Sequence, residues 1–157
     1  MPSSINISAR RSLKLNNVLI RNIADEEIPE FVKIAEMMDN YIKSKGSYPV
    51  GPLMQRTCIE VDEEGVLNVF NSLLWQSGKY IHNMEPPYSI ESTWRVRNCL
   101  YTRFIGEEVN IKYAYDKMGV YAYENDTVLK GATYTVYVDK QDDIITADIF
   151  MECVMDE

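Results

Sequence analysis

The order of predicted elements occurs twice along this chain, and this duplication constrains the fold more than any other feature. Each half predicts a strand, a helix and two further strands, over about residues 13–76 and 92–154. Gly51 in the first half corresponds to Gly131 in the second, at an offset of 80 residues. One helix and three strands are too few to bury their own apolar face. We therefore expect an α+β fold in which two tandem strand–helix–strand–strand repeats form one antiparallel sheet, with both helices on one face.

Two segments have the residue spacing of amphipathic helices. After a predicted N-cap at Asp25, apolar residues that include Val32 and Met38 recur at helical intervals and share one face. A second helix is predicted between Gly106 and Asn125, where apolar residues again follow one face. Each helix is followed by two strand-like segments with a turn between them.

The length of 157 residues corresponds to one domain, which we expect to span residues 1–157. Residues 1–11 precede the first predicted strand, and we expect them to form a flexible arm. This start has no long apolar run, so it does not resemble a secretory signal. No later stretch approaches the ~20 apolar residues that cross a bilayer. We therefore expect a cytoplasmic protein that does not bind a membrane.

Charge and cysteine content exclude several classes of function. The chain has 24 acidic and 16 basic residues, and its net charge is −8. Nucleic-acid binders rely on a basic face to displace counterions, so we expect no direct contact with nucleic acid. Cys58, Cys99 and Cys153 are widely spaced, and His82 is the only histidine. We expect three buried free thiols, no disulfide framework, no metal site and no cofactor.

Four segments carry a resemblance to a known family. They are the loop Tyr48–Pro52, the strand Leu100–Gly106, the triplet Thr135–Tyr137 and the terminal strand Thr146–Met151. Together with the twofold plan, they make the chain resemble the GyrI-like, or effector-binding, domain family from about Leu15 to Val154. The resemblance implies a ligand-binding domain like those of multidrug-responsive transcription regulators, here without a DNA-binding part of its own.

The chain departs from the family pattern at two positions. Thr135 stands where the family has a pocket glutamate, and Glu152 stands near the point where a proline usually follows the last strand. The first departure disfavours recognition of lipophilic cations, because a buried carboxylate is what pairs with them. Some stand-alone relatives are thought to hydrolyse small electrophiles with a glutamate and a tyrosine. Tyr137 is retained here and the glutamate is not, so we expect no enzyme.

Strand alternation predicts which side chains point away from the helices and line an open groove. On the strand that enters the second helix, Leu100 and Phe104 are predicted to be core, whereas Tyr101 and Arg103 point away. Tyr134 and Val136 are likewise predicted to be core. Whether Trp75, in the first half, points toward the helices or away from them is left open. The predicted ligand-binding residues are Tyr137, Tyr101, Asp148, Thr135, Phe150, Trp75, Arg97 and Arg103.

Several functions remain open at this point. The first is a small-molecule binding module for an amphipathic aromatic ligand. The second is a protein-interaction or accessory protein that uses the same concave sheet face, with Arg95, Arg97 and Arg103 opposite an acidic partner. A third, a small hydrolase that uses Tyr137, has no catalytic motif in its support. Unpaired outer strands also leave a homodimer open.

Overall fold

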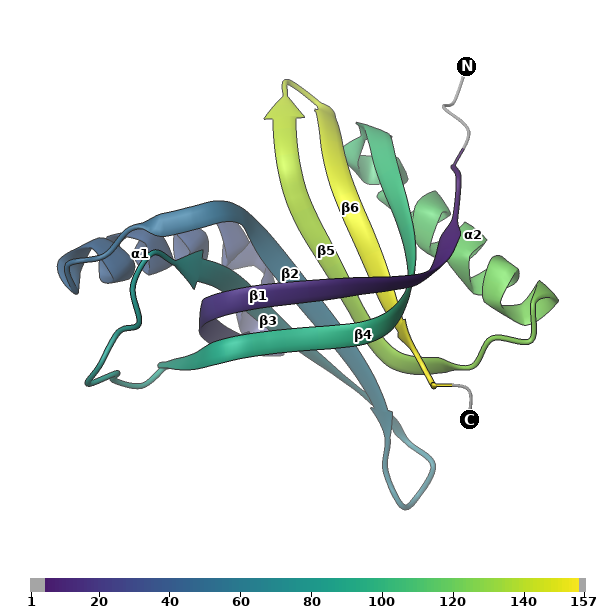
Figure 1. Ribbon diagram of the computed structural model, residues 1–157, viewed down its shortest axis with the longest axis horizontal. Coiled ribbons are helices and arrows are strands. Elements are labelled where there is room, and N and C mark those ends of the chain that lie inside the picture. Colours follow the sequence, from purple (N-terminus) through teal and green to yellow (C-terminus); the bar gives the residue numbers. More distant parts are fainter. Residues whose placement is uncertain (1–4, 156–157) are drawn as a thin grey trace. The chain divides into compact units, whose positions relative to one another are not determined.

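The structure, a computed structural model, describes residues 5–155 (Figure 1). The chain divides into two compact units. Unit 1 combines the chain up to Leu13 with the chain from Val96 onward, and unit 2 is Lys14–Arg95. Two long strands, β1 (Ser8–Ile23) and β4 (Tyr88–Glu107), run from one unit into the other.

Unit 2 contains a short helical turn, a helix and two strands besides its parts of β1 and β4. These elements are η1 (Asp25–Glu30), α1 (Phe31–Ser44), β2 (Pro49–Val61) and β3 (Leu67–Ser77). Strand β3 pairs antiparallel with both β1 and β2, so the strand order is β1–β3–β2.

One face of α1 packs on this sheet. Ile34, Met38 and Ile42 are buried with Leu19 and Leu73 in one apolar cluster. The period of the apolar residues predicted the helix, but the predicted face was partly wrong.

The start of this helical segment also differs from the prediction. Val32, assigned to the buried face, is 76% exposed. The N-cap is Ala24 rather than Asp25, and the side chain of Glu27 accepts a hydrogen bond from the Ala24 backbone N–H at 3.0 Å. The α-helix begins only at Phe31, after a 3-10 turn that contains Pro29.

Unit 1 contains the corresponding elements of the second half. They are η2 (Glu108–Asn110), α2 (Ile111–Glu124), β5 (Leu129–Gln141) and β6 (Ile144–Cys153). Strand β6 pairs antiparallel with both β4 and β5, in the order β4–β6–β5. Ala114, Met118 and Ala122 of α2 are buried in one cluster with Leu100 and Ile149 of the strands. These core assignments confirm the predicted apolar face of α2.

The predicted α+β class is confirmed, because two α-helices accompany six strands within the described residues. A single shared sheet with both helices on one face stays a prediction. Strand β1 begins at Ser8, inside the segment predicted to be an arm, whereas Met1–Ser4 of that arm lie outside the described residues. No helix in the described part of the chain has the length and apolar character needed to cross a membrane.

The three cysteines are buried free thiols, as predicted. Burial, together with the nearby Cys153 and Glu152, raises the pKa of the Cys99 thiol to about 12. Cys99 is therefore a protonated, unreactive side chain at neutral pH.

Candidate functional site

The face of unit 1 that points away from α2 brings together four of the predicted site residues. In the register of β4 with β6, Tyr101 lies opposite Phe150 and Arg103 lies opposite Asp148. The alternate residues of both strands, such as Leu100 and Ile149, belong to the core under α2. Because side chains alternate along a strand, the four predicted residues share the other face.

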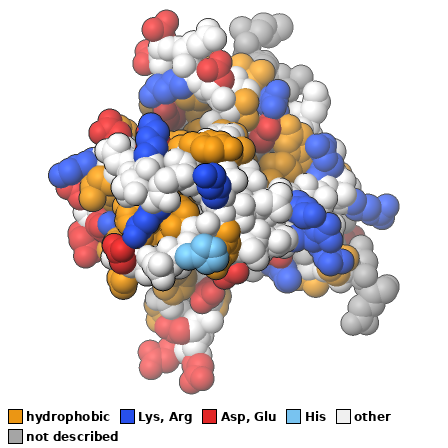
Figure 2. All heavy atoms as spheres, turned by 60° about the vertical axis from the view of Figure 1, so that its left-hand side comes forward, with side chains coloured by type: hydrophobic (Ala, Val, Ile, Leu, Met, Phe, Trp, Pro, Cys, Tyr) orange, Lys and Arg blue, Asp and Glu red, His pale blue; other side chains and the backbone are white. Residues whose placement is uncertain are grey.

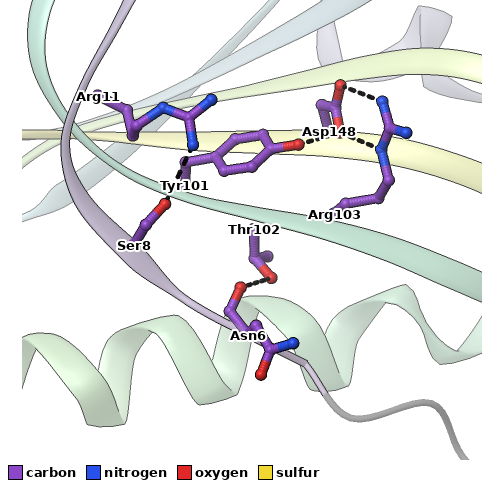
Figure 3. Close-up of polar contacts among 7 residues, drawn as sticks. All are labelled: Asn6, Ser8, Arg11, Tyr101, Thr102, Arg103 and Asp148. Carbon is purple, nitrogen blue, oxygen red and sulfur yellow. Dashed lines mark hydrogen bonds and ion pairs between the residues drawn. The ribbon is translucent and has the colours of Figure 1, made fainter.

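Hydrogen bonds and ring contacts connect these side chains (Figure 3). Oδ1 of Asp148 accepts a hydrogen bond from the Tyr101 hydroxyl at 2.7 Å and from Nε of Arg103 at 2.8 Å. Oδ2 of Asp148 accepts a second bond from Nη2 of Arg103 at 3.0 Å. The rings of Tyr101 and Phe150 have their centroids 5.0 Å apart, a distance typical of interacting aromatic pairs.

Arg11, from the part of β1 that belongs to unit 1, also contacts these side chains. Tyr101, Arg103, Asp148, Phe150 and Arg11 are called the cluster below. Its guanidinium carbon lies 4.3 Å from the centroid of the Tyr101 ring, which is a cation–π distance. Its Nη1 donates a hydrogen bond to the Ser8 hydroxyl at 3.2 Å. Figure 3 shows the Tyr101 ring between Arg11 and Asp148. Sequence reasoning missed Arg11 because it placed this residue in a flexible arm.

The protonation states of the cluster follow from these contacts. Burial opposes ionisation of Asp148, but the hydrogen bonds from Arg103 and Tyr101 lower the pKa of its carboxyl overall. Burial and the Asp148 carboxylate raise the pKa of the Tyr101 hydroxyl. Hydrogen bonding to Asp148 likewise raises the pKa of Arg103. At neutral pH the cluster therefore holds one carboxylate, a neutral phenol that donates to it, and two guanidinium cations.

A cavity of about 280 Å³ adjoins the cluster, near the lower end of the usual size for small-molecule sites, ~300–1,000 Å³. Its lining residues are Asn6, Ile7, Ser8, Tyr101 and Arg103. On the other side of β4, the Thr102 hydroxyl donates a hydrogen bond to the Asn6 carbonyl at 2.7 Å (Figure 3). This bond links the N-terminal residues that line the cavity to β4, the strand that carries Tyr101.

Thr135 and Tyr137 lie on the opposite face, so the predicted alternation of β5 is wrong. Thr135 pairs with Ile149 of the α2 core and is only 3% exposed. Its hydroxyl shares a 2.6 Å hydrogen bond with the hydroxyl of Tyr115 on α2. Tyr137 pairs with Ala147, another member of that core. The structure therefore does not bring these two residues together with Tyr101.

The side chains of β5 that share the face of Asp148 are Tyr134 and Val136. Tyr134 pairs with Phe150 and Val136 pairs with Asp148. Both were predicted to be core under the helix, and both are buried on the other face. Each face of β5 mixes aromatic with β-branched residues, so polarity alone does not separate them. The ladder with β6 is also interrupted by two register shifts.

The remaining two predicted residues lie elsewhere. Trp75 belongs to unit 2, where its ring packs against the α1 core and its Nε1 donates a hydrogen bond to the Gly51 carbonyl at 3.0 Å. Arg97 is exposed on β4, and its predicted role in ligand binding stays a prediction. No group of three potential metal ligands occurs among residues 5–155.

Comparison with known proteins identifies the fold. No family model and no curated protein matches the chain. An EcmrR–DNA complex solved by cryo-EM matches with a TM-score of 0.66 and 14% identity, over 95% of this chain and 57% of that chain. A protein bound to tetraphenylphosphonium matches with a TM-score of 0.55 and 11% identity, over 96% and 94% of the two chains. A hydrolase from Listeria innocua matches with a TM-score of 0.52 and 12% identity, over 92% of each chain. At these identities the likeness shows a shared fold.

Proposed function

We propose that this chain is a small-molecule binding module of the GyrI-like, effector-binding type, and that an amphipathic aromatic ligand binds beside Tyr101. The observation that carries the proposal is the Tyr101 ring, which lines a cavity together with Arg103, donates a hydrogen bond to Asp148 and packs against the buried Phe150 ring. Binding sites for small molecules combine apolar surface with a few polar groups that orient the ligand. The shared fold with a tetraphenylphosphonium-bound protein gives independent support.

We also propose that the two halves are tandem copies of one structural unit. Both read strand, 3-10 turn, helix, strand, strand, and in both the last strand pairs with the other two. The buried positions of α1 and α2 also correspond. Met38 and Met118 occupy the central buried position of their helices, at an offset of 80 residues.

A non-catalytic role agrees with the environment of Tyr137. Burial, then the neighbouring Tyr115 and Glu108, raises the pKa of the Tyr137 hydroxyl. A tyrosine that acts as a base or nucleophile needs a lowered pKa, so this environment works against that chemistry. The fold shared with a hydrolase does not supply a mechanism by itself.

A second candidate function, protein interaction, is favoured by the β2–β3 hairpin of unit 2. Ile59 pairs with Val69 and Val61 pairs with Leu67, which places four apolar side chains on one face. They are between 47% and 64% exposed. Acidic side chains gather at the tip of this hairpin, at the bottom of Figure 2. A stable interface between two copies of the chain would need about 20–30 residues from each copy, and this patch offers four. The acidic hairpin tips of two such copies would also repel each other. The hairpin therefore suits an apolar segment flanked by Lys or Arg better than a second copy.

Binding of aromatic probes tests the first proposal. A fluorimetric thermal-shift panel of aromatic compounds of positive, zero and negative charge should contain at least one that raises the melting temperature. Affinity for that compound should fall about 2- to 10-fold in Tyr101→Ala, since each aromatic contact contributes ~0.5–1.5 kcal/mol. Tyr123→Ala is the matched control, because Tyr123 lies on α2 and is 86% exposed. An absence of binding across all three charge classes, or equal loss in both variants, would contradict the proposal.

A further inference from the structure

We propose that the ligand of this site is an aromatic anion, whose carboxylate or phosphate group is attracted by the positive charges of Arg11 and Arg103. The inference rests on the proposed small-molecule function and adds the charge of the ligand. Its basis is the composition of the cluster: two guanidinium groups, from Arg11 and Arg103, accompany one carboxylate, that of Asp148. The electrostatic partners of Asp148 are these same two arginines. The cluster thus has one positive charge in excess.

The carboxylate of Asp148 is already occupied. Its two oxygens accept three hydrogen bonds, two from Arg103 and one from Tyr101. The Arg103 pair is bidentate, which is the strongest geometry for a guanidinium and a carboxylate. A cationic ligand would have to displace Arg103 while Arg11 repels it. The site therefore disfavours cations.

Both arginines keep further donors for an anion. A guanidinium has five N–H groups, of which Arg103 directs those on Nε and Nη2 at Asp148. Arg11 directs one at Ser8. The Arg103 side chain is 49% exposed and lines the cavity, so its remaining N–H groups are accessible to a ligand. Planar guanidinium groups bind carboxylate and phosphate oxygens in pairs.

The same arrangement accounts for an aromatic body on the anion. The Arg11 guanidinium lies over one face of the Tyr101 ring. Arg11 is exposed, and a guanidinium can also stack on the ring of a ligand. Tyr101 supplies apolar ring surface at the cavity, and the buried Phe150 ring packs against it. An aromatic ring with an acidic substituent thus meets both kinds of group within one cluster.

Three probes that share one ring system test the sign of the charge. We would titrate the protein at pH 7 with 2-naphthoate, 2-naphthamide and 2-naphthylmethylammonium by isothermal calorimetry. Naphthoate should bind about 10-fold more tightly than the amide, and the ammonium should bind most weakly, as expected for one charge-assisted contact. Arg11→Gln and Arg103→Gln should each remove the preference for naphthoate.

Two further variants keep the result interpretable. Arg10→Gln removes the same charge one residue away from Arg11, and it should leave the preference in place. Arg11→Gln leaves every hydrogen bond of Asp148 intact, so it remains informative if Arg103→Gln fails to fold. Equal binding of the three probes would overturn the anionic ligand and leave the small-molecule function standing. If the preference for naphthoate survives in both Arg11→Gln and Arg103→Gln, the anionic ligand is likewise overturned and the small-molecule function stands. No binding of any probe would overturn both.

Discussion

The two helices hold their sheets through a methionine at the same central position, and truncation of each measures how much that contact stabilises. Met38 of α1 and Met118 of α2 are both fully buried. Replacement by alanine removes three heavy-atom groups, at about 0.8 kcal/mol for each, and the cavity left behind adds roughly 1 kcal/mol. We expect Met38→Ala and Met118→Ala each to lower the free energy of unfolding by about 3–4 kcal/mol.

The neighbouring methionine of α1 provides an internal control. Met37 is 50% exposed, so Met37→Ala should change the free energy of unfolding by less than ~0.5 kcal/mol. Urea titrations followed by circular dichroism would give the three values. The two clusters share no residue, so the Met38 and Met118 losses should add in the double variant within about 0.5 kcal/mol. Equal effects of Met37→Ala and Met38→Ala would refute the assignment of the buried face of α1.

Two further predictions concern polar contacts. Hydrogen bonds from Arg21 and from the Ala24 backbone lower the pKa of Glu27 to about 2, from an ordinary value of 4.5. The stabilisation by Glu27 is therefore present above pH 4.5 and lost as the pH falls toward 2. Glu27→Gln should have a lower urea midpoint than the native chain at pH 6. The difference between the two midpoints should nearly disappear by pH 2, and a difference that does not change with pH would contradict this. Thr135→Val leaves the Tyr115 hydroxyl without its 2.6 Å partner and should cost about 1–2 kcal/mol of unfolding free energy, whereas adding Tyr115→Phe should recover part of it, which a double-mutant cycle would show.

The sequence predicted the elements and much of the helix packing, because helical spacing depends only on local order. In α2, the period placed Ala114, Met118 and Ala122 on one face, and all three are buried. In α1 the same reasoning erred at Val32, which precedes Met38 by six residues and therefore lies roughly 120° away from it around the helix. Ile34, four residues before Met38, occupies the buried face instead.

The candidate site could be predicted only in part. Tyr101, Arg103, Asp148 and Phe150 were assigned to one face because their strands alternate clearly between apolar and polar residues. Arg11 could not be found, since its place depends on the pairing of a segment far away in sequence. Nothing local distinguishes a charged strand end from a flexible arm.

The position of Thr135 changes the meaning of the missing family glutamate. The resemblance suggested that Thr135 replaces a pocket carboxylate, which left that one position of the predicted groove without a negative charge. In the structure Thr135 points at Tyr115 of α2, so even a glutamate at position 135 would place its charge under the helix. On the open face, β6 instead carries Asp148, which Arg103 neutralises with two hydrogen bonds, and Glu152, which pairs with Lys130 at 3.6 Å. Arg11 then adds a cation that no carboxylate of the cluster balances, because Asp148 is already paired. Because position 135 lies under the helix, the missing glutamate does not set the charge of the open face; in our proposal Arg11 is what directs the site toward anions rather than lipophilic cations.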